Sequence, residues 1–209
     1  MKLSNKVAMI VAWTILLTLT FAVAAFAAES EKPAIAVLFV NNAKTTYDDE
    51  LGKKITDNIN STLSSKYTLV PGKPFVEKLA KLGITDLSTA ERNDISEAFK
   101  SESINFVIYI ELQPVLIKSW ESFFNQGTAA TVTLPLKVID LSQNKYLYNG
   151  KFIEQADNSS IFGGVGTKAG ALAALGKVLK SVDEVLVSRI PETFAPSTKS
   201  NTAPGKIEQ

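Results

Sequence analysis

Apolar runs alternate with helical patterns through the first half of the chain. Residues 33–41 and 104–112 are almost wholly apolar and are of strand length, which is typical of strands buried on both faces of a sheet. Between them, apolar residues recur every four positions while polar residues occupy the other side, which predicts an amphipathic helix. These apolar residues are Leu51, Ile55, Ile59 and Leu63.

Three shorter elements complete this half. Residues 67–70 predict a short strand that ends at Pro71-Gly72, and residues 75–82 continue with helical spacing as far as Gly83. A further helix is predicted to begin around Ser88, because Ser88 and Glu91 have the spacing of a capping box.

The second half of the chain has a different pattern. Residues 131–139 and 145–155 alternate between apolar and polar positions, which predicts antiparallel meander strands, and residues 119–127 are expected to form the link before them. Residues 163–176 are rich in small side chains and lead into a helix that ends at Pro191, which we expect to pack closely on its neighbours. The whole pattern predicts an α+β fold: a mixed sheet of about five to six strands with a C-terminal antiparallel meander, and helices packed mainly on one face.

The amino terminus has the pattern of a secretory signal peptide. Lys2 and Lys6 precede an apolar run over residues 7–19, and Ala25-Phe26-Ala27 places small residues where signal peptidase requires them. We therefore expect residues 1–27 to be a signal peptide that is cleaved after Ala27. The alternative is a retained anchor, because residues 7–28 are long enough to span a membrane.

Export changes the apparent charge of the protein. The chain has 22 basic and 21 acidic residues, and loss of Lys2 and Lys6 leaves 20 and 21, a net charge of −1. No basic block remains, which argues against a nucleic-acid partner. We expect a single α+β domain over residues 28–194 and a disordered tail over 195–209, which has little apolar content.

The chain contains neither histidine nor cysteine. These absences exclude the usual serine triads, cysteine-histidine dyads and histidine-ligated zinc, as well as lipid attachment to a cysteine at the mature terminus. They also exclude disulfides, which many small exported proteins of eukaryotes need, and so favour a bacterial envelope. No catalytic motif, cofactor site or metal site is predicted, and we expect a protein that is not an enzyme.

One acidic residue and one glycine-rich segment are candidates for a ligand cleft. Glu111 follows a buried apolar strand, where ligands often bind, although a solvated strand end is the plainer interpretation. Gly164 and Gly166 precede the last helix, but their spacing does not match a nucleotide-binding loop. A flexible entry to a tightly packed helix is the favoured interpretation.

Three large aromatic residues lie within five positions of the predicted link: Trp120, Phe123 and Phe124. Such residues are unusual in a solvent-facing turn. They either cover the core or form a hydrophobic contact surface for a partner or a membrane.

The segments 35–41, 51–63, 67–70 and 98–110 together resemble the amino-terminal domain of TolB and the periplasmic domains of CsgG-type proteins. In these families an apolar strand that ends in Asn precedes a helix, a short strand, and later a helix that leads into another strand. The resemblance implies a fold and assigns no functional residue. The chain lacks TolB's propeller and the lipid-attachment cysteine of CsgG-type proteins.

These observations support two hypotheses of function. The first is an exported bacterial cell-envelope protein, periplasmic or extracellular, that acts as a non-enzymatic interaction or adaptor module and binds another envelope protein. The alternative is a periplasmic binding protein for a small molecule or an envelope polymer. A membrane is expected as a partner only if the signal segment is retained, and the sequence leaves the oligomeric state open.

Overall fold

A computed structural model describes residues 32–121, 126–160 and 166–192. The strands are β1 (Ala34–Asn41), β2 (Thr68–Pro71), β3 (Phe106–Leu112), β4 (Leu116–Glu121), β5 (Gln126–Asp140) and β6 (Lys145–Ser160). The helices in these ranges are α2 (Asp48–Leu63), α3 (Lys73–Lys81), α4 (Arg92–Phe99) and α5 (Thr167–Arg189).

All six strands belong to one mixed sheet. Strand β1 is parallel to both β2 and β3, whereas β3, β4 and β6 are each antiparallel to β5. Because β6 pairs with β5 along its whole length, β3 and β4 share the other edge of β5: β3 pairs with residues 136–140 and β4 with residues 126–131. This confirms the predicted mixed sheet with its antiparallel meander.

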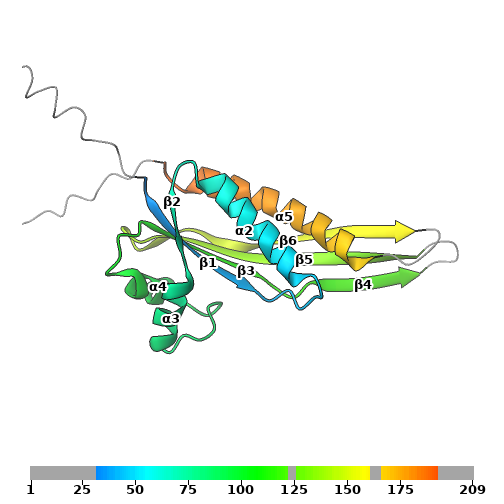
Figure 1. Ribbon diagram of the computed structural model, residues 1–209, viewed down its shortest axis with the longest axis horizontal. Coiled ribbons are helices and arrows are strands. Elements are labelled where there is room, and N and C mark those ends of the chain that lie inside the picture. The colour runs from blue at the N-terminus through cyan, green and yellow to red at the C-terminus, as the bar shows by residue number, and fades with distance from the viewer. Residues whose placement is uncertain (1–31, 122–125, 161–165, 193–209) are drawn as a thin grey trace, which may run out of the picture. The chain divides into compact units, whose positions relative to one another are not determined.

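One face of the sheet is covered by the two long helices, α2 and α5 (Figure 1). The apolar series that predicted α2 is buried in this layer, as are Ala171, Ala174 and Leu175 of α5. A Cβ atom added at Gly170 would lie 3.4 Å from the Cβ of Ala130, so the small residues of α5 do allow close packing on the sheet.

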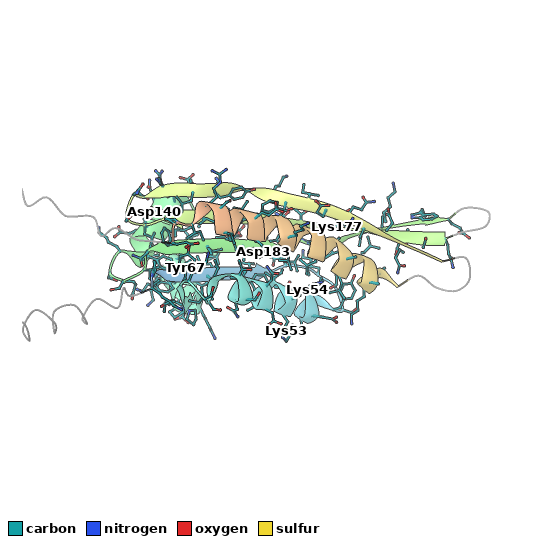
Figure 2. The ribbon with its side chains drawn as sticks, turned by 90° about the horizontal axis from the view of Figure 1, so that it is seen from above. Lys53, Lys54, Tyr67, Asp140, Lys177 and Asp183 are labelled. Carbon is teal, nitrogen blue, oxygen red and sulfur yellow. The ribbon has the colours of Figure 1, made fainter. Side chains whose placement is uncertain are left out.

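Polar contacts between the two long helices lie along their exposed side (Figure 2). The Asp183 carboxylate of α5 accepts hydrogen bonds from Asn58 and Thr62 of α2, at 2.6 and 2.7 Å. Lys54 of α2 donates to the Leu172 carbonyl oxygen at 3.2 Å. Lys177 of α5 donates to the Gln155 carbonyl oxygen of β6 at 2.9 Å, and so connects this layer to the sheet.

The opposite face carries the two short helices, α3 and α4, near β1 and β3 (Figure 1). Phe75 of α3 and Phe99 of α4 stack with their ring centroids 3.9 Å apart over a core that includes Ala36, Leu38 and Val107. The two long helices therefore cover one face and the two short helices cover only part of the other, as predicted for helices packed mainly on one face.

Two local expectations were wrong. Helix α4 is capped by Glu91 rather than Ser88: the Asp94 N–H donates to the Glu91 side chain, and the Glu91 N–H donates to Asp94 Oδ2 at 2.9 Å. Most of the predicted link over residues 119–127 is strand, because Ser119 to Glu121 belong to β4 and β5 begins at Gln126.

The predicted signal peptide and tail lie outside the described residues. In the segments that the structure does describe, no helix has the length and apolarity needed to cross a membrane.

Candidate functional site

Strand β4, at one edge of the sheet, is exposed on both of its faces. All six of its residues are exposed, including Leu116 at 65%, Ile117 at 38% and Trp120 at 37%. Exposed apolar residues that are contiguous on one element are typical of an interaction surface. Strand β4 is therefore the first candidate for a functional site.

One edge of β4 has no partner strand within the described residues. Strand β1 pairs with β3 only as far as Leu112, and the last contacts along that edge are Asn42 N–H to the Leu112 oxygen and Val115 N–H to the Ala43 oxygen. Beyond Val115, β4 pairs only with β5 on its other side. A free strand edge presents unpaired backbone donors and acceptors that can bind another strand.

The register of β4, β5 and β6 defines an uncovered sheet surface on the side opposite α5. Alternate β5 residues from Ala130 to Val138 face α2 and α5, so their neighbours face the other way. Leu116 pairs with Thr131, Trp120 with Gly127, and Ile153 with Thr133, which places all three on that other side. We call Leu116, Trp120 and Ile153 the open face; no helix covers it in the described part of the chain (Figure 1).

Trp120 lies across the strand pair onto Gly127. A Cβ atom added at Gly127 would be 2.3 Å from Trp120 Cζ2, so the ring occupies the space above the glycine. A hollow of about 400 Å³ lies beside it, lined by Ser119, Glu121, Gln126 and Thr128 together with this pair. Trp120 is thus positioned by the sheet while more than a third of its surface remains exposed.

Of the predicted aromatic surface, the structure describes Trp120 alone. Phe123 and Phe124 lie outside the described residues, and their role in a contact surface stays a prediction. Trp120 itself lies in a strand rather than in a link.

Glu111 is buried, with 6% of its surface exposed, and so is not a solvated strand end. The Tyr109 hydroxyl donates to one carboxylate oxygen at 2.8 Å, and Asn42 Nδ2 donates to the other at 2.9 Å. Burial, followed by this hydrogen bond to Glu111, raises the pKa of the Tyr109 hydroxyl well above its ordinary value of 10.0. Both oxygens of Glu111 therefore have partners within the fold.

Lys137 of β5 lies on the same side of the sheet as Glu111. Its ammonium donates to the carbonyl oxygens of Ser88 and Ala90 at 3.0 and 2.9 Å, and lies 5.3 Å from the centroid of the Tyr109 ring. Burial lowers the pKa of Lys137, while the negative charges of Glu91, Glu111 and Asp86 oppose that shift. These contacts hold the segment before α4 against the sheet.

The structure does not bring together the residues of the predicted ligand cleft. Glu111 shares the side of the sheet that faces α3 and α4, whereas Gly166 caps the start of α5 on the other side. The Gly166 carbonyl oxygen accepts a hydrogen bond from Asn158 Nδ2 at 3.0 Å. Gly164 lies outside the described residues. Among those residues, no group of three or more carboxylates could hold a metal ion.

No protein-family model matches the chain, and no curated protein matches it significantly. Several solved structures have a similar arrangement. The lipoprotein GNA1162 from Neisseria meningitidis is 14% identical, over 74% of this chain and 98% of that one, with a TM-score of 0.41. The LpoB C-terminal domain from Salmonella enterica is 15% identical, over 60% and 84%, with a TM-score of 0.36.

TolB from Acinetobacter baumannii, whose family the sequence resembles, is also among them. It is 9% identical over 76% of this chain, which spans 28% of TolB, with a TM-score of 0.38. At these identities none of the similar structures assigns a functional residue to this protein.

Proposed function

We propose that this protein is an exported, non-enzymatic protein of the cell envelope that works by binding another envelope protein. The observation that carries the proposal is the open face beside β4, where Leu116, Trp120 and Ile153 are 65%, 37% and 53% exposed. Burying such side chains against a partner would contribute about 25 cal/mol for each Å² of apolar surface removed from water.

The polar chemistry of the described residues supports binding rather than catalysis. The buried acid Glu111 has both oxygens engaged by Tyr109 and Asn42, and the buried part of Lys137 is held by two carbonyl oxygens. These contacts engage both oxygens of Glu111 and the ammonium of Lys137 within the fold. With no histidine in the chain, a general acid or base active near neutral pH would have to come from such groups.

Chemical cross-linking in intact cells tests the proposal. We expect an envelope protein to be cross-linked to the natural chain and to be lost when Trp120, Phe123 and Phe124 are all replaced by serine. Val187→Ser is the matched control, because Val187 is 57% exposed but lies on α5, away from the open face. Persistence of every cross-linked partner in the triple variant would overturn the proposed surface.

A second candidate function is the binding of a small molecule or an envelope polymer. It is favoured by a hollow of about 510 Å³ lined by Arg92, Lys137, Tyr146 and Asn149, among others. Arg92 lies over the Tyr146 ring at 5.9 Å, and its buried Nε has no hydrogen-bond partner in the described part of the protein. In this second function the Arg92 guanidinium binds an anionic or hydroxylated ligand in the hollow.

Thermal unfolding tests this second function. A ligand that binds the folded state raises the melting temperature by mass action. We expect a sugar, nucleotide or peptidoglycan fragment to raise the melting temperature of the natural protein and to have no effect on Arg92→Met. A library without any such shift would rule out this function for those ligand classes.

A further inference from the structure

We infer that the hollow beside Arg92 binds an acidic sugar, with the carboxylate on Arg92 and a neighbouring neutral sugar residue further along helix α4. This inference rests on the second candidate function and deepens it, because it names the class of ligand and the path of that ligand over the protein. It does not involve the open face beside β4. We call the hollow lined by Arg92 and Lys137 the first hollow.

Two cationic side chains line the first hollow. Neither Arg92 nor Lys137 forms an ion pair with another described residue. The ammonium of Lys137 is held by the carbonyl oxygens of Ser88 and Ala90, so it supplies a positive charge in a defined position. The buried Nε of Arg92 has no hydrogen-bond partner among the described residues, and leaving such a donor unpaired costs free energy that a bound oxygen would recover.

The charge of the lining favours a singly charged ligand. Among the described residues that line the first hollow, Glu91 is the one carboxylate, and its side chain accepts a hydrogen bond from the Asp94 N–H. Two cations and one anion leave a net charge of +1. A carboxylate matches this charge and can pair with a guanidinium through two parallel hydrogen bonds, whereas a phosphate carries about −1.5 to −2 at pH 7.

The remaining chemistry of the first hollow suits a hydroxylated ring. Its volume of about 510 Å³ lies within the range of small-molecule sites. Asn149 contributes an amide that can both donate and accept hydrogen bonds, and Tyr146 contributes an aromatic ring. A sugar offers hydroxyls to such an amide and an apolar face to such a ring.

A second hollow, of about 520 Å³, adjoins the first along α4. Asn93 lines both hollows. Its Oδ1 accepts a hydrogen bond from Asn144 Nδ2 at 3.2 Å, and Ser96 donates to Asn144 Oδ1 at 2.8 Å. Asn144 and Ser96 also line the second hollow, so the lining next to Asn93 is polar and uncharged. A ligand longer than one sugar residue can therefore continue from the first hollow over Asn93.

The charged residues of the second hollow are paired within the fold. Lys100 pairs with Glu97 at 3.4 Å, and Glu102 pairs with Lys78 of α3 at 2.5 Å. No cation of this hollow is thus left for a second acidic group in the described part of the chain. The second hollow suits a neutral sugar residue, and the acidic residue belongs in the first.

Three sugars that differ at one carbon test the class of ligand. Glucose, glucuronic acid and glucose 6-phosphate carry a hydroxyl, a carboxylate and a phosphate at the sixth carbon of the same ring. We expect glucuronic acid to bind the purified protein at least about tenfold more tightly than glucose in an NMR titration, because charge-assisted hydrogen bonds are stronger than neutral ones. The difference should fall as salt is added. Equal or tighter binding of glucose or glucose 6-phosphate would overturn the carboxylate.

A disaccharide tests the path along α4. Cellobiouronic acid joins glucuronic acid to a neutral glucose residue, and cellobiose is its uncharged counterpart. We expect cellobiouronic acid to bind more tightly than glucuronic acid and to shift the side-chain amide resonances of Asn93 and Asn144 as well as that of Asn149. Shifts at Asn149 alone would overturn the path over Asn93, and the absence of any binding would overturn the whole inference.

Variants of Arg92 test which residue binds the carboxylate. We expect the preference for cellobiouronic acid over cellobiose to be lost in Arg92→Met and reduced in Arg92→Lys, which keeps the charge without the planar fork. Lys151→Met is the matched control, because Lys151 is exposed on β6 and lines neither hollow. Melting temperatures without ligand show that each variant folds. An unchanged preference in Arg92→Met, or an equal loss in Lys151→Met, would contradict the site.

This inference and the proposed functions fail in distinguishable ways. Equal binding of cellobiouronic acid and cellobiose, with both lost in Arg92→Met, would overturn the carboxylate and leave the second candidate function standing. Tighter binding of the dipeptide alanyl-alanine would identify a peptide carboxylate and overturn the sugar. Cross-linking through the open face should be the same in Arg92→Met as in the natural chain, so the test of the first proposed function is independent of this hollow.

Discussion

At the scale of single residues, the buried hydroxyl of Tyr109 makes the stability of the fold depend on pH. Its hydroxyl donates to Glu111, and burial and this bond raise its pKa above 10.0. An unfolded chain would release the tyrosine proton above about pH 10, while the folded protein would retain it. The stabilisation is therefore complete below pH 10 and is lost as the pH rises further.

Tyr109→Phe tests this pH dependence. Near neutral pH we expect a loss of about 1–3 kcal/mol in the free energy of unfolding, because a buried Glu111 oxygen loses its donor. Above about pH 10 the natural protein should lose stability more steeply than the variant, since phenylalanine cannot ionise. Urea unfolding from about pH 8 to pH 11 measures both effects. Parallel curves would show that Tyr109 ionises alike in the folded and unfolded states.

The contact between Trp120 and Gly127 gives a second prediction at this scale. In Gly127→Ala, the new Cβ would lie 2.3 Å from the ring, so the tryptophan must move out into solvent. We expect a loss of about 1–3 kcal/mol and a red-shifted fluorescence emission. Trp120 is the only tryptophan after residue 27, so the emission of the processed protein reports on this ring alone.

The control for this prediction is Gly166→Ala. No atom lies within 4 Å of the added Cβ, and the backbone φ of −71° suits alanine. We expect unchanged emission and a loss of no more than about 1 kcal/mol, the scale of an N-cap replacement. An unshifted emission in Gly127→Ala would mean that the ring does not lie over the glycine.

At the scale of elements, helix α4 has two candidate N-cap residues that are three positions apart in the sequence. Glu91 and Asp94 form the observed capping box, whereas Ser88 contributes its carbonyl oxygen to Lys137. We expect Glu91→Ala to lower the free energy of unfolding by about 1 kcal/mol and Ser88→Ala to change it by less than about 0.5 kcal/mol. Urea midpoints measure both, and a larger cost for Ser88→Ala would contradict the observed cap.

The elements that were predicted correctly from the sequence are those in which burial produces a regular pattern of apolar residues. The apolar runs of β1 and β3 follow from burial on both faces, and the spacing of Leu51 to Leu63 follows from one buried helix face. The end of strand β4, from Ser119, was assigned to a link because exposure on both faces leaves no alternation to detect. Strand β4 forms because it pairs with residues 126–131 of β5, which lie further along the chain.

The candidate site was predictable to a similar extent. The aromatic content around Trp120 left a core cover and an exposed contact surface open as interpretations, and the structure shows that Trp120 itself is 37% exposed. The environment of Glu111 was not predictable, because one of its two donors, Asn42, comes from a segment 69 residues away. The free edge of β4 was equally hidden, since it depends on where β1 ends relative to β3.

At the scale of the whole molecule, the described fold begins after the predicted signal peptide. The first strand starts at Ala34. We expect a chain that begins at residue 28 to keep the stability of the described sheet. A retained anchor would keep the same fold but would hold it at a membrane.

Processing in a bacterial host distinguishes these two outcomes. We expect amino-terminal sequencing of the exported protein to begin at Ala28, and its melting temperature to equal that of a chain expressed from residue 28. Ala27→Leu should accumulate as uncleaved precursor, because signal peptidase requires a small residue at that position, whereas Ala28→Leu should still be processed. An uncleaved natural chain in the membrane fraction would instead establish the anchor, and would place the open face of β4 within reach of membrane-bound partners.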